Sequence, residues 1–114
     1  MEKTLGSIIG NLKHLSRKQR TPILKKGKYL VVAQGNQRFW LSDGQVLSDM
    51  LDLLEVLRKM SEETYKKHVN QEKNDFAEWI GNVLHDRICA IKLRKAHSLN
   101  DSVKVLEENL LRYR

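Results

Sequence analysis

The apolar residues of this chain follow two periods, one typical of helices and one typical of strands. From Leu47 onward, apolar positions recur at helical spacing. Between residues 28 and 42 they instead form two short runs rich in β-branched and aromatic side chains. The pattern predicts a mostly helical α+β fold, with one β-hairpin packed against a bundle of four to five helices.

Residues that can cap helices divide the helical part of the chain. A side-chain oxygen at a helix start accepts a hydrogen bond from a free amide of the first turn. The predicted helices are 49–60 capped by Ser48, 62–69 capped by Ser61, a helix starting at Asn74-Asp75, its continuation capped by Asp86, and 102–113 capped by Asn100-Asp101. The helix after Asn74 has the clearest apolar stripe, formed by Phe76, Trp79, Ile80, Val83 and Leu84. A further short helix is predicted over residues 5–15.

The predicted hairpin covers residues 28–42. Its strands are 29–33 and 38–41, joined by Gly35-Asn36, which tolerates the positive φ of a tight turn. Alternation along the second strand places Phe39 and Leu41 on one face and Arg38 and Trp40 on the other. Asp43-Gly44 is a second turn signal.

The net charge of +7 is concentrated at the start of the chain. Residues 1–30 contain eight Lys or Arg and one acidic residue, whereas residues 31–114 contain thirteen of each sign. We therefore expect a basic N-terminal arm at residues 1–27, followed by a single hairpin-plus-helices domain at 28–114. A clustered cationic segment binds nucleic acid by releasing the counterions condensed on phosphates. A solvated surface, an acidic protein or a membrane surface are the other interpretations of such an arm.

The predicted nucleic-acid contacts combine this arm with an aromatic residue of the hairpin. They are Lys13, Arg17, Lys18, Arg20, Lys25, Lys26, Lys28, Arg38 and Trp40. An exposed Trp40 beside cations would stack on a base. Alternatively, Trp40 covers a helix or a second subunit.

The most specific string in the chain is His68-Val69-Asn70-Gln71-Glu72-Lys73-Asn74-Asp75-Phe76-Ala77-Glu78-Trp79-Ile80. A structural interpretation makes Asn74 an N-cap, Asp75 a first-turn acid and Trp79 a core residue. His68 would then hydrogen-bond Asp75 or a nearby backbone group. Alternatively, His68, Asn70, Asn74 and Asp75 form a polar recognition patch for a partner.

This string resembles the H-V-N-x-x-K-N-D-F-x-x-W-I motif of a family of small archaeal and bacterial proteins of unknown function. The resemblance runs from Phe39 to about Leu93, roughly half of the chain. It includes Phe39, Leu41, Asp43 and Gly44, which follow the family's F-x-L-x-D-G hairpin end. The resemblance implies a domain boundary and no activity.

Catalytic and metal signatures are not recognisable in the sequence. It has no Gly-rich phosphate loop, no G-x-S-x-G and no H-E-x-x-H, and its four histidines are scattered. Its single cysteine, Cys89, has no partner for an internal disulfide. We therefore predict a protein that is not an enzyme and has no cofactor or metal. Without an apolar run of spanning length, we expect no membrane segment and a cytoplasmic location.

The sequence thus predicts a non-enzymatic nucleic-acid-binding protein, chromatin- or ribosome-associated, that contacts phosphates through its N-terminal arm. The alternative is a protein–protein adaptor that uses the hairpin edge or the His68–Asp75 patch. A homodimer through the last helix or the hairpin edge is a further expectation.

Overall fold

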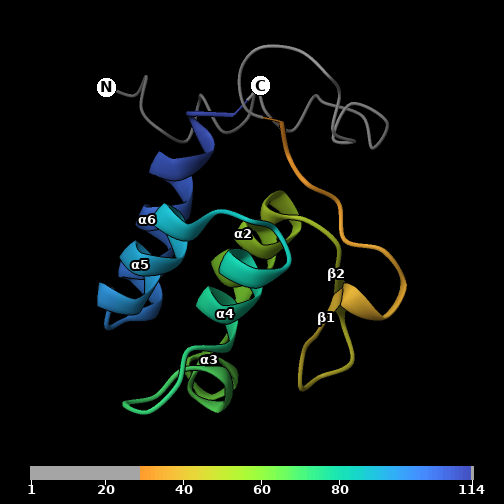
Figure 1. Ribbon diagram of the computed structural model, residues 1–114. Helices are drawn as coiled ribbons and strands as arrows, with labels where there is room; N and C mark the ends of the chain where they lie inside the picture. Colours follow the sequence, from red (N-terminus) through yellow and green to blue (C-terminus); the bar gives the residue numbers. More distant parts are fainter. Residues whose placement is uncertain (1–28, 114) are drawn as a thin grey trace.

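The computed structural model describes residues 29–113. The elements in chain order are the 3₁₀ turn η2 (Gly35–Gln37), strands β1 (Phe39–Trp40) and β2 (Val46–Leu47), and helices α2 (Met50–Lys59), α3 (Glu62–His68), α4 (Asp75–Asn82), α5 (Arg87–Lys95) and α6 (Leu99–Leu110). This confirms the mostly helical α+β fold. Figure 1 shows the small hairpin on one side of the helices and α5 and α6 on the other. The predicted helix at 5–15 and the predicted contacts from Lys13 to Lys28 lie outside the described residues.

Three of the predicted helix caps are confirmed. The side chains of Ser61, Asn74 and Asp86 each accept a hydrogen bond from a first-turn amide, at the starts of α3, α4 and α5. Two predicted caps are wrong. Asp49, not Ser48, caps α2, and Ser98, not Asn100-Asp101, caps α6, which therefore covers 99–110 instead of 102–113. At each of these starts the sequence offers more than one residue that can form a cap.

Helix α2 lies at the centre of the core. Its Leu51, Leu53 and Leu54 are completely buried. Helix α6 packs along α2 and α5, and α4 packs against α5. A Cβ added at Gly81 would lie 3.2 Å from Ala90 Cβ, so the glycine allows the close approach of α4 and α5.

The hairpin differs from the prediction in its pairing. Segment 29–33 is not a strand, and Gly35-Asn36 lies in η2 instead of joining two strands. Strand β1 pairs antiparallel with β2, with Phe39 opposite Leu47 and Trp40 opposite Val46. The turn is formed at Asp43-Gly44, where Gly44 has a φ of +95°. This register places Phe39, Leu41 and Leu47 in the core, which is what selects the second turn over the first.

A buried polar network joins the start of α5 to the end of α6. Asp86 is almost fully buried and accepts hydrogen bonds from the Cys89 amide, from Asn109 Nδ2 at 3.0 Å and from the Tyr113 hydroxyl. Burial, the hydrogen bond to Asp86 and the charge of Asp86 all raise the pKa of Tyr113. The network fixes the chain that follows α6 against the start of α5.

Candidate interaction surfaces

The predicted His68–Asp75 cluster is a structural junction between three elements. His68 is the last residue of α3 and is buried. Its Nε2 accepts a hydrogen bond from the Ser42 amide at 3.1 Å, so Nδ1 carries the proton that faces Asp75 Oδ2, also at 3.1 Å. The imidazole also packs against Phe39 and Phe76, with centroids 5.4 and 5.3 Å away. His68 therefore fixes the hairpin turn and the start of α4 to α3.

The side chains of the two asparagines in the string, Asn70 and Asn74, form hydrogen bonds with backbone groups of the chain. Asn70 Oδ1 accepts from the amides of Glu72 and Lys73, which closes the turn between α3 and α4. Asn74 Oδ1 caps α4, and its Nδ2 donates to Leu93 O at 3.3 Å near the end of α5. These bonds support the structural interpretation of the string over the recognition patch.

Trp79 completes this junction from α4. Its indole is buried, and Nε1 donates to Gln37 O at 2.8 Å. The ring meets Phe39 edge-on, with centroids 5.5 Å apart. Trp79 thereby anchors η2 and β1 on the helices and is a core residue, as the stripe predicted.

Trp40 lies on the face opposite the buried Phe39 and Leu41, as alternation predicted, and of the alternatives left open for it the structure shows the more exposed one. The residue is 62% exposed, and its cross-strand partner Val46 is 37% exposed. The groove beside Trp40 also carries the carboxylates of Asp75 and Glu78. These carboxylates pair with Lys73 and Arg94, and the predicted stacking of Trp40 on a nucleic-acid base stays a prediction.

Helix α5 presents a surface that the sequence reasoning did not single out. Ile88 and Ile91, one turn apart, are 52% and 54% exposed. Arg87, Lys92 and Lys95 are exposed on the same helix, which contains no acidic residue between 87 and 95. The available signal was the charge of this segment, which has four basic side chains including Arg94, whereas residues 31–114 as a whole contain equal numbers of basic and acidic residues.

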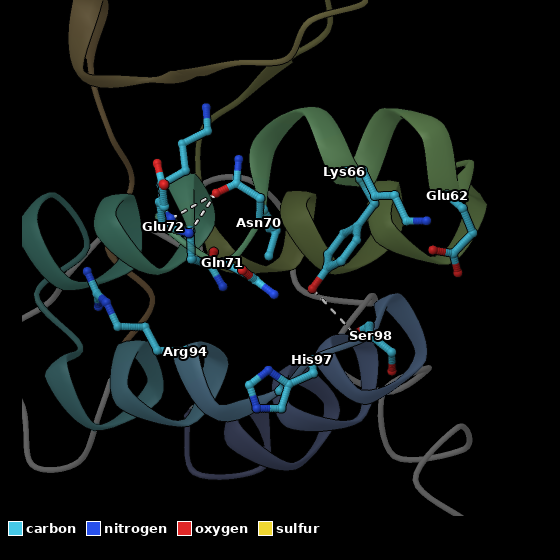
Figure 2. A pocket seen from close by; sticks show the side chains of 13 residues that line it. Glu62, Lys66, Asn70, Gln71, Glu72, Arg94, His97 and Ser98 are labelled. Carbon is cyan, nitrogen blue, oxygen red and sulfur yellow. Dashed lines mark hydrogen bonds between the residues drawn. The ribbon is translucent and has the colours of Figure 1, made fainter.

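A cleft of ≈ 790 Å³ lies between α3, the turn that follows it and the junction of α5 with α6. Figure 2 shows Arg94 and His97 on one side of this cleft and Asn70, Gln71 and Glu72 on the other. Its lining mixes Lys66, Lys73 and Arg94 with Glu62 and Glu72, so it does not select one charge class of ligand.

The described residues contain no group of three or more His, Cys, Asp or Glu side chains placed to hold a metal ion. Within residues 29–113, no helix has the length and apolar character required to cross a membrane. Comparison with known protein families, with curated proteins and with solved structures gives no match. The resemblance noted for the His68–Ile80 string therefore remains a prediction.

Proposed function

We propose that this protein binds nucleic acid without sequence readout, through its basic N-terminal segment and the basic surface of α5. The observation that carries the proposal is the charge distribution: the net charge of +7 is matched by the excess of eight basic residues over one acid in residues 1–30. Phosphate contacts from such a segment give affinity by counterion release.

The α5 surface supports this proposal from the described part of the chain. Arg87, Lys92 and Lys95 are exposed on one short helix. The fourth cation of α5, Arg94, forms an ion pair with Glu78 of α4. The exposed side chains of Arg87, Lys92 and Lys95 can contact the phosphate backbone of a nucleic acid. Such contacts do not depend on the base sequence.

A salt titration with charge-neutralised full-length variants tests the proposal. The arm variant is R17Q/K18Q/R20Q, the α5 variant is R87Q/K92Q/K95Q, and the matched control is K59Q/K66Q/K67Q, which removes three exposed cations from α2 and α3. Binding of labelled DNA and RNA duplexes and single strands is measured by anisotropy between about 50 and 200 mM salt.

The arm variant should lose about tenfold or more in affinity and show a shallower salt dependence, by about 0.9 in the logarithmic slope for each lost phosphate contact. The α5 variant should show a smaller loss in the same direction, and the control should bind like the wild type. Equal affinities of the arm variant and the control would contradict the proposal.

A further inference from the structure

A shallow groove of ≈ 400 Å³ lies between β1 and α4. Its apolar lining comes from Phe39, Trp40, Trp79 and Val83. Trp79 is held by its hydrogen bond to Gln37 O, while the indole of Trp40 remains largely in solvent. Tryptophan is enriched among the residues that dominate binding at interfaces, so the exposed indole of Trp40 next to the fixed ring of Trp79 is a candidate contact for a partner side chain.

The polar side of the groove is acidic. Asp75 and Glu78 lie one turn apart on α4, a helix without Lys or Arg between residues 75 and 82. Asn82 Nδ2 donates to Glu78 Oε2 at 2.9 Å and orients that carboxylate. Glu78 is well exposed, with a side-chain accessibility of 66%. The groove therefore offers an entering cation an exposed and oriented carboxylate, that of Glu78.

Two cations of the chain form ion pairs with these carboxylates. Arg94 Nη2 lies 3.3 Å from Glu78 Oε1, and Lys73 Nζ lies 3.2 Å from Asp75 Oδ2. Both pairs are solvent-exposed, and such pairs contribute little to stability. A guanidinium that entered from a partner would exchange with Arg94 at little cost and would gain the indole face of Trp40 as well.

We propose that the groove between β1 and α4 binds an arginine side chain from a basic segment of a partner protein. Arginine suits this groove better than lysine because its planar guanidinium stacks on an indole and donates two parallel hydrogen bonds to a carboxylate. Trp40 supplies the stacking face, and Glu78 supplies the carboxylate. The inference is independent of the proposed binding of nucleic acid and gives a partner chemistry to the adaptor alternative.

A labelled Gly-Arg-Gly-Arg-Gly peptide with blocked ends is a suitable probe for the full-length protein. Its affinity is measured by anisotropy, with the citrulline and lysine versions of the peptide in parallel. The variants are Trp40→Leu and Glu78→Gln, and the matched control is Glu63→Gln, an exposed acid on α3. Circular dichroism establishes that each variant is folded.

We expect Trp40→Leu to weaken peptide binding by about tenfold, because it removes the cation–π contact and its apolar area. Glu78→Gln should weaken binding by about threefold, and Glu63→Gln should leave it unchanged. The citrulline peptide should not bind, and the lysine peptide should bind less tightly. The proposal is overturned if the arginine peptide does not bind the wild type, if all variants bind alike, or if lysine is equally effective.

The result is separable from that of the nucleic-acid proposal. The variant R17Q/K18Q/R20Q should keep its affinity for the arginine peptide, and Trp40→Leu should keep its affinity for nucleic acid. Loss of both activities in either variant would contradict the assignment of two separate surfaces.

Discussion

The His68–Trp79 junction and the α5 surface differ in how the chain uses their polar groups. At the junction, His68, Asn74 and Trp79 donate to or accept from other parts of the same chain. On α5, Arg87, Lys92 and Lys95 project into solvent beside two exposed isoleucines. The junction residues of the string thus serve the fold, whereas the cations of α5 remain exposed to solvent.

Replacing the two tryptophans tests the structural role of the junction, with the largest expected effect, against an exposed indole on β1. Trp79→Ala should lower the free energy of unfolding by about 3–5 kcal/mol, because it leaves a cavity and removes the hydrogen bond to Gln37. Trp40→Ala, at an exposed position, should change it by about 0.5 kcal/mol or less. Urea denaturation followed by circular dichroism measures both values. Similar losses for the two variants would refute the separation of core and surface indoles.

A second comparison uses His68 and the cations of α5. His68→Ala should cost about 2–4 kcal/mol, because the Ser42 amide and Asp75 lose a partner and the ring contacts with Phe39 and Phe76 are lost. The variant R87Q/K92Q/K95Q should unfold within about 0.5 kcal/mol of the wild type. If neutralising α5 destabilised the domain as much as His68→Ala, its cations would have a structural role.

The smallest expected effect concerns the tyrosines at alkaline pH. Burial raises the pKa of both Tyr65 and Tyr113. In the folded state these tyrosines have a pKa above the unfolded value of about 10. Their contribution to the free energy of unfolding is therefore fully present below pH 10 and is lost as the pH rises further. Tyr113→Phe should cost about 1 kcal/mol at neutral pH, through the lost bond to Asp86.

The pH dependence itself provides the check. Above pH 10, the stability of the wild type should fall more steeply than that of Tyr113→Phe, which cannot ionise at this position. Thermal unfolding at pH 7 to 11 measures both slopes. Parallel curves over this range would rule out a contribution from Tyr113. The matched variant Arg112→Gln, at an exposed neighbouring position, should follow the wild type.

Sequence reasoning was most successful where the signal is local. The stripe after Asn74 and the caps at Ser61, Asn74 and Asp86 involve residues within a few positions of one another. The hydrogen bond between His68 and Asp75 was also predicted, as one of two alternatives, and the structure adds the Ser42 amide as the second partner. The exposure of Ile88 and Ile91 was not predicted, because the consecutive apolar residues 88–91 are compatible with more than one buried face of the helix.

The amino-acid sequence by itself determined the helical segments, three of their caps and the basic character of the N-terminal segment, because these depend on neighbouring residues and on composition. Only the tertiary structure decided that β1 pairs with β2 across Asp43-Gly44 and that α5 turns Ile88 and Ile91 outward. Both outcomes depend on which distant apolar side chains share one core. Both Gly35-Asn36 and Asp43-Gly44 could form a turn next to β1, and no local preference distinguishes them. The turn forms at Asp43-Gly44, where the resulting register buries Phe39, Leu41 and Leu47.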